Sequence, residues 1–207
     1  MRATVADLGD EHFARPSGCA GRLVRDLVCH LVVDARDVLI TLATPAVAAP
    51  TRDAVAYWRV VEPPTGDDPL DALTVRLAAA YEQPSLLRFH LDDVGSAAGC
   101  AAALTGPTGR VGTQHQVLTV DDYLGAYVLE RMLHHLDLAA CVPGAARPPA
   151  EGPAAARELF EGVVGAEFPR SFPDEDVLLV GTGRRVPTDA ERATLGDLAA
   201  RLPFPVG

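Results

Sequence analysis

The chain has 207 residues and carries 18 Lys and Arg against 28 Asp and Glu, a formal net charge of −10. This length suits one large domain, or one domain with a small appendage. The acidic balance argues against a nucleic-acid partner, because proteins neutralise phosphates with a basic surface. All 18 basic residues are arginine. The absence of lysine excludes Schiff-base chemistry and a lysine general base.

The four cysteines are scattered and form no C-x-x-C pair: Cys19, Cys29, Cys100 and Cys141. This pattern predicts neither a disulfide framework nor a cysteine-type zinc site, and it indicates a reducing cytoplasm. The first residues lack the apolar core of a secretory signal. The longest apolar stretch, residues 38–50, is interrupted by Thr and Pro. We therefore expect no membrane span and no membrane partner.

Helical periodicity dominates the first two thirds of the chain. Between Gly21 and Ala43 apolar residues recur at spacings of three, four and seven, which predicts a helix with one buried face. Thr119, followed by two aspartates, has the pattern of a helix N-cap. Pro- and Gly-rich loops at 63–69 and 106–112 separate the remaining expected helices, over residues 70–81, 84–104 and 119–140. Four long helices predict a helical bundle over residues 1–141.

Residues 142–153 are rich in Pro, Gly and Ala, which is typical of a linker. The remaining residues, 154–207, are predicted to form a small α/β segment. Its expected elements are a helix at 154–164, a strand at 177–180, and a last helix that opens with the capping box Thr188-Asp-Ala-Glu191. A segment this short makes a marginal independent domain, so we expect it to pack on the bundle.

The most informative segment is the last predicted helix of the bundle. Glu130 and His134 are four residues apart, hence one helical turn, and Asp137 continues the same line three residues later. A buried carboxylate needs a partner, and a divalent cation held by Glu130 and His134 would supply one. The alternative is that Glu130 pairs with Arg131 or Arg88 and that His134 is a hydrogen-bonded core histidine.

His30 is the next candidate, because it lies on the apolar side of the first long helix, next to Leu31. A lone histidine in such a place is more often structural than a ligand. Together with Glu130 and His134, however, it would complete three zinc-type ligands from two helices of one bundle. Three protein ligands with one open position form the catalytic arrangement of zinc, not the structural one.

Two segments resemble signatures of a known family. Residues 16–31, with Cys19, Gly21 and His30-Leu31, resemble the opening of the mycothiol-dependent maleylpyruvate isomerase family, whose pattern is roughly C-x-G-W-x-V-x-D-L-x-x-H-L. Residues 119–138 are similar to its second signature, in which E-x-x-x-H-x-x-D-L follows an aspartate-tyrosine-leucine run. With the tail around Gly181-Thr-Gly-Arg-Arg, the resemblance covers nearly the whole chain.

The resemblance implies a DinB-like metal-binding four-helix bundle with a zinc-type site made by His30, Glu130 and His134. It also implies mycothiol as a thiol cofactor, with Asp137 near the bound thiol as a catalytic and cofactor-binding residue. The chain departs from the pattern at Arg22, where the family has tryptophan, and its C-terminal portion is shorter than that of the isomerase.

We therefore expect a metal- and thiol-dependent transferase or isomerase that acts on a small electrophilic substrate. Zn²⁺ or another divalent ion would activate the thiol, Asp137 would orient it, and an arginine such as Arg88 would hold an acidic substrate. The alternative is a non-catalytic metal-binding or regulatory DinB-like module, marked by a closed bundle or a filled fourth coordination position. No oligomeric state is predicted.

Overall fold

The computed structural model describes residues 1–61, 69–142 and 145–206, so most of the predicted loop at 63–69 and two residues of the predicted linker lie outside it. The helices are α1 (Arg2–Ala6), α2 (Val24–Leu42), α3 (Ala54–Tyr57), α4 (Pro69–Ala80), α5 (Pro84–Leu104), α6 (Val120–Ala139), α7 (Glu151–Val164), α8 (Asp174–Gly181) and α9 (Asp189–Leu195), with 3-10 turns η1 (Asp10–His12) and η2 (Gly196–Arg201). Strands β1 (Arg110–Thr113) and β2 (Gln116–Thr119) form an antiparallel hairpin between α5 and α6. Among the described helices, none is both long and apolar enough to cross a membrane.

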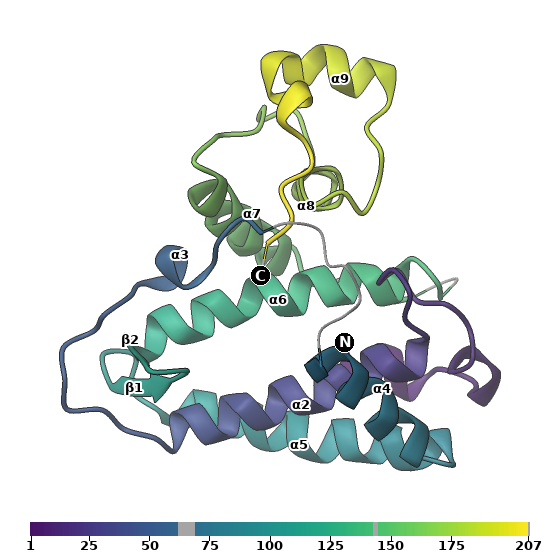
Figure 1. The fold of residues 1–207 in the computed structure, drawn as a ribbon, viewed down its shortest axis with the longest axis vertical. Helices are drawn as coiled ribbons and strands as arrows, with labels where there is room; N and C mark the ends of the chain where they lie inside the picture. Colours follow the sequence, from purple (N-terminus) through teal and green to yellow (C-terminus); the bar gives the residue numbers. More distant parts are fainter. Residues whose placement is uncertain (62–68, 143–144, 207) are drawn as a thin grey trace.

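Helices α2, α4, α5 and α6 form the bundle, with α2 in contact with each of the other three (Figure 1). The N-cap predicted at Thr119 is confirmed, because its side chain accepts a hydrogen bond from the backbone N–H of Asp122. At the start of α2, the Asp26 side chain accepts a hydrogen bond from the backbone N–H of Leu23. The apolar stripe of α2 supplies the fully buried Leu27 and Leu31, which pack against Leu138 of α6. The predicted mainly α fold class is confirmed.

The C-terminal segment packs on the face of α6 that points away from α2 and α5 (Figure 1). Leu129, Leu133 and Leu136 of α6 share one core cluster with Phe160 of α7 and Leu178 of α8. The expectation that this segment packs on the bundle is confirmed. Helix α6 therefore contributes to the hydrophobic core on both of its sides.

The strand predicted at 177–180 is wrong, because these residues belong to α8. A short apolar run has no periodicity that distinguishes a strand from a buried helical turn. Three acidic residues, Asp174, Glu175 and Asp176, precede the run and lie in the first turn of α8, where they favour a helix N-terminus. The β structure lies instead in the hairpin of β1 and β2. Strand β1 begins within the predicted loop at 106–112, so the last three residues of that loop are strand.

Candidate metal centre

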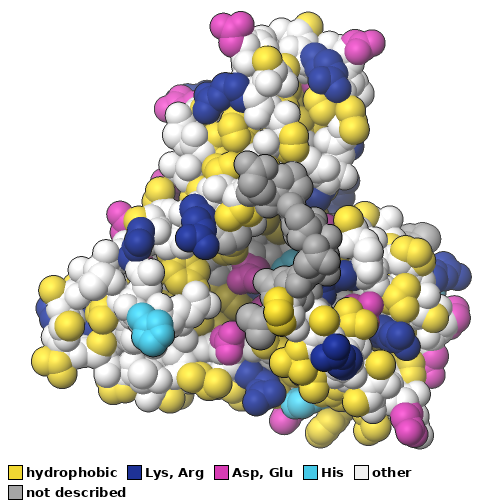
Figure 2. Space-filling view, in the orientation of Figure 1, with side chains coloured by type: hydrophobic (Ala, Val, Ile, Leu, Met, Phe, Trp, Pro, Cys, Tyr) yellow, Lys and Arg dark blue, Asp and Glu magenta, His cyan; other side chains and the backbone are white. Residues whose placement is uncertain are grey.

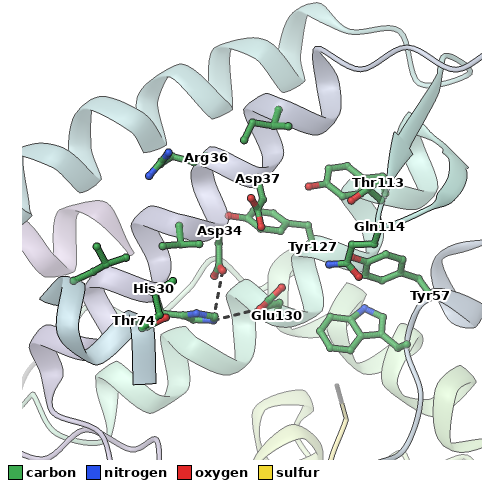
Figure 3. Close-up of a pocket in the computed structure, with 16 residues that line it drawn as sticks. His30, Asp34, Arg36, Asp37, Tyr57, Thr74, Thr113, Gln114, Tyr127 and Glu130 are labelled. Carbon is green, nitrogen blue, oxygen red and sulfur yellow. Dashed lines mark ion pairs between the residues drawn. The ribbon is translucent and has the colours of Figure 1, made fainter. Parts of the chain in front are cut away.

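Two helical turns face each other between α2 and α6. His30 and Asp34 lie four residues apart on α2, and Glu130 and His134 lie four apart on α6, so each pair shares one helix face. Figure 3 shows His30, Asp34 and Glu130 converging from the two helices. Ligand atoms of all four side chains lie within 4.8 Å of one another. The structure thus brings together the three predicted ligands and adds Asp34.

The spacing of these atoms fits a divalent metal ion. His30 Nε2 lies 3.5 Å from Asp34 Oδ1 and 3.5 Å from Glu130 Oε1, and His134 Nε2 lies 3.9 Å from the same Glu130 oxygen. Two atoms that each bind a tetrahedral zinc ion at about 2.1 Å are about 3.4 Å apart. The second carboxylate oxygen of Asp34 is buried and has no hydrogen-bond partner among the described residues. A cation would satisfy it.

Burial and neighbouring charges shift the pKa values in this cluster. Burial favours a lower pKa for His30, but contact with Glu130 and the charge of Asp34 raise it above its ordinary value. Burial favours a higher pKa for Glu130, but His30 and His134 hold it below its usual range. Burial is the main cause that raises the pKa of Asp34 to about 7, and the charge of Glu130 is the second. Paired carboxylates with opposed shifts are typical of functional sites.

Asp137 lies behind His134 and does not line the cavity described below. Its Oδ2 is 3.3 Å from His134 Nδ1, and its side chain is 2% exposed. Burial lowers the pKa of His134, which favours the neutral imidazole that binds metals. With Nδ1 bound to Asp137, the other ring nitrogen of His134 faces Glu130. The imidazole ring of His30 packs edge-on against that of His134, with 4.7 Å between ring centroids.

A cavity of about 560 Å³ opens beside the cluster. His30, Asp34 and Glu130 form part of its wall (Figure 3). The rest of the lining is mainly aromatic and apolar and includes Tyr57, Trp58, Tyr123, Tyr127, Leu73, Leu77 and Ile40. Figure 2 shows acidic side chains and an imidazole inside a hollow between the bundle and the C-terminal part. Within the described residues, the centre therefore borders a cavity large enough for a small molecule.

A second hollow of about 470 Å³ meets the first one at Glu130 and at Tyr57 and Trp58. It differs in charge, because its lining includes Arg52 and Arg59. Both hollows thus border the Glu130 carboxylate. The walls of the first are acidic and apolar, and the walls of the second are basic.

The structure does not bring Arg88 to the cluster. Its guanidinium donates to Leu8 O at 3.0 Å and to Asp10 Oδ1 at 2.7 Å, and it covers the Phe13 ring at 5.3 Å. Arg131 covers the Tyr127 ring at 5.1 Å. Within the described part of the chain, the ion-pair partners of Glu130 are the two histidines rather than either arginine.

Sequence reasoning missed two residues that contact predicted site residues. Asp34 follows His30 by one helical turn, so the spacing H-x-x-x-D could have indicated it. Arg184 belongs to the tail that resembles the family, but no local spacing links it to Asp137, which it binds.

Asp34 allows a prediction about pH. Metal binding must displace protons from His30, whose pKa is raised, and from Asp34, whose pKa is about 7. Zinc affinity should therefore rise as the pH increases from 6 to 8, because fewer protons compete. Asp34→Asn removes one competing proton. A plot of the logarithm of the zinc affinity against pH should therefore have a smaller slope in this variant than in the wild type, by up to about one unit per pH unit near pH 6.

The measurement is a competition titration with a coloured chelator at several pH values. Asp37→Asn is the matched control, because Asp37 lies on the same helix and lines the same cavity but is outside the ligand cluster. Equal slopes for the wild type and Asp34→Asn would show that Asp34 does not share protons with the metal site.

The fold and the site together define a class, a DinB-like helical bundle with a cluster of metal-type ligands between two of its helices. The family model of the mycothiol maleylpyruvate isomerase N-terminal domain matches residues 1–139. The chain belongs to this family. No curated protein and no solved structure matches the chain. The family match ends at the last residue of α6, so α7, α8 and α9 lie beyond it.

Proposed function

We propose that the protein is a metal-dependent transferase or isomerase that uses a small thiol, of the mycothiol type, against an electrophilic substrate. The observation that carries this proposal is the open ligand cluster: imidazole and carboxylate groups line a cavity large enough for a small molecule. The mycothiol association of the family supports the choice of thiol.

His30, Glu130 and His134 would hold Zn²⁺ or another divalent ion. Such an ion, when bound, lowers the pKa of a coordinated thiol and so supplies a thiolate at neutral pH. Asp34 lies at the same place, and its buried carboxylate oxygen without a hydrogen-bond partner among the described residues would accept the proton of an incoming thiol. The aromatic wall of the cavity gives one side of the site an apolar lining.

The two hollows support a reaction with two reactants, because each one reaches Glu130 by a different route. Arg52 and Arg59 line the hollow that borders Glu130, so they are better placed than Arg88 to bind an acidic group of the electrophile. Arg52 is partly engaged, since its Nε donates to Gln116 Oε1 at 2.8 Å. We assign the thiol to the larger hollow and the electrophile to the basic one.

A specific observation also favours a second candidate, a non-catalytic metal-binding module. Asp34 offers a fourth ligand atom within the cluster. If it binds the metal together with His30, Glu130 and His134, the coordination is complete and no position stays open for a thiol.

We also place the protein in the cytoplasm, where thiol cofactors are kept reduced. The four cysteines are free, and none pairs with another. This state is typical of a reducing compartment.

The test is thiol consumption by zinc-loaded protein with a panel of small electrophiles. We expect consumption that disappears when a chelator removes the metal and returns when zinc is added. Chelation should leave the helical circular dichroism in place and lower the melting temperature, because the helices bury their own apolar core.

Two results would contradict the proposal. Zinc binding without thiol binding would favour the non-catalytic module. Complete loss of helicity in chelator at room temperature would make the metal structural, as in small domains that fold only around zinc.

A further inference from the structure

An arginine from the C-terminal segment contacts the far side of the metal centre. Arg184, which follows α8, donates from Nε to Asp137 Oδ1 at 2.8 Å and from Nη2 to Asp137 Oδ2 at 3.0 Å. The carboxylate is almost fully buried, and the arginine is largely so. A buried carboxylate requires such a partner, and the planar fork of arginine fixes its orientation as well as its charge.

The turn that carries Arg184 is held by the backbone around it. Gly183 has a φ of +81°, and a Cβ at this position would approach Pro203 to 2.8 Å. Two backbone hydrogen bonds flank Arg184. The N–H of Phe204 donates to Gly181 O at 2.7 Å, and the N–H of Arg185 donates to Leu179 O at 3.0 Å. The arginine is therefore presented to Asp137 from a fixed turn.

Asp137 transmits this contact to a metal ligand. Its Oδ2, which binds Arg184, also lies 3.3 Å from His134 Nδ1. A carboxylate held by arginine is an acceptor, so Nδ1 carries the proton and Nε2 keeps its lone pair toward Glu130. Cys19 adds a third contact, because its thiol donates to Asp137 Oδ2 at 3.4 Å. Among the described residues, each oxygen of Asp137 thus has at least one partner, and three of the four contacts fall on Oδ2.

We propose that Arg184 is a positioning residue of the metal centre: it fixes Asp137, which in turn fixes the ring orientation and the tautomer of His134. The proposal rests on the metal centre described under the proposed function. It makes the C-terminal segment, which lies beyond the family match, a structural part of that centre. It also assigns Asp137 to the support of His134 instead of to direct contact with the thiol.

The experiment compares Arg184→Gln with Arg185→Gln in the full chain. The two arginines are adjacent, and Arg185 binds Asp176 and Glu191, both at 2.8 Å, with no link to His134. Arg184→Gln should weaken Zn²⁺ and Co²⁺ binding by up to about 10- to 100-fold, because Asp137 would no longer be held against His134 and a metal-binding histidine would lose its partner. It should also change the visible absorption of bound Co²⁺. Arg185→Gln should change only the melting temperature.

A measurement on the metal-free protein tests the tautomer directly. Nitrogen-15 NMR should show His134 with its proton on Nδ1 in the wild type, and a mixture of tautomers in Arg184→Gln. If Arg184→Gln does not fold, Arg184→Lys keeps the charge without the fork, and it should still weaken Co²⁺ binding and mix the tautomers.

The outcomes separate the two proposals. If the wild-type protein binds no metal, the proposed function is refuted, independently of the results for the Arg184 variants. A wild type that binds metal, with the Arg184 variants indistinguishable from Arg185→Gln in Co²⁺ affinity, absorption and His134 tautomer, overturns the positioning role alone.

Discussion

His30→Ala and His134→Ala should each remove the metal from the purified protein. Each change deletes an imidazole whose Nε2 lies within 4 Å of Glu130 Oε1. The remaining side chains are one imidazole and two carboxylates, a weaker ligand set for zinc. We expect the affinity to fall by more than about 100-fold, beyond the effect of losing an outer partner of a ligand. Elemental analysis of the dialysed protein measures the stoichiometry, and titration with Co²⁺ measures the affinity.

His115→Asn is the control for these variants. His115 lies in the turn between β1 and β2 with a φ of +63°, a conformation that asparagine tolerates, and it is outside the ligand cluster. The control should bind metal like the wild type. Full metal occupancy in both His30→Ala and His134→Ala would refute the ligand assignment.

Phe160→Ala should produce the largest loss of stability. Phe160 is fully buried in the core that α6 shares with α7 and α8, and its ring lies 5.9 Å from that of Phe168. Such a truncation costs about 3–5 kcal/mol through lost burial and the cavity that it leaves. For a chain of this size the melting temperature should fall by roughly 6–20 °C. Thermal circular dichroism and calorimetry measure the change.

The same experiment tests the domain organisation. Because α6 belongs to the cores on both sides, we expect one cooperative transition that shifts as a whole. Phe89→Ala, on an α5 side chain that is 70% exposed, should change the stability by no more than about 0.5 kcal/mol. Two transitions, of which only one shifts in Phe160→Ala, would instead favour independent units at 1–141 and 154–207.

The local features of the sequence predicted the bundle well. The residues that begin and end helices act through neighbours a few positions away, which is why Thr119 and Thr188 could be identified as caps. The pair Glu130 and His134 was predictable for the same reason, since a helix sets their spacing. The proximity of this pair to His30 depends on the packing of α2 against α6. The resemblance to a family, rather than the local pattern, supported the prediction that the three residues form one site.

Features that depend on distant contacts were not predictable in this way. Asp137 has a bidentate partner in Arg184, which is supplied by a turn of the C-terminal segment. The spacing of Asp34 from His30 is a local signal, but its burial against Glu130 depends on the approach of α6. The apolar run at 177–180 became part of a helix because tertiary packing, together with the acids before it, decides such ambiguous runs.

The position of Trp58 has a practical consequence. It is the single tryptophan of the chain, and it lines both hollows. Its indole N–H donates to Ala126 O of α6 at 3.1 Å, which holds the ring in place. Indole fluorescence therefore originates at one point of the molecule, the partition between the two hollows. A molecule that enters from either side alters the polarity around this ring, so the protein carries its own optical reporter of ligand entry.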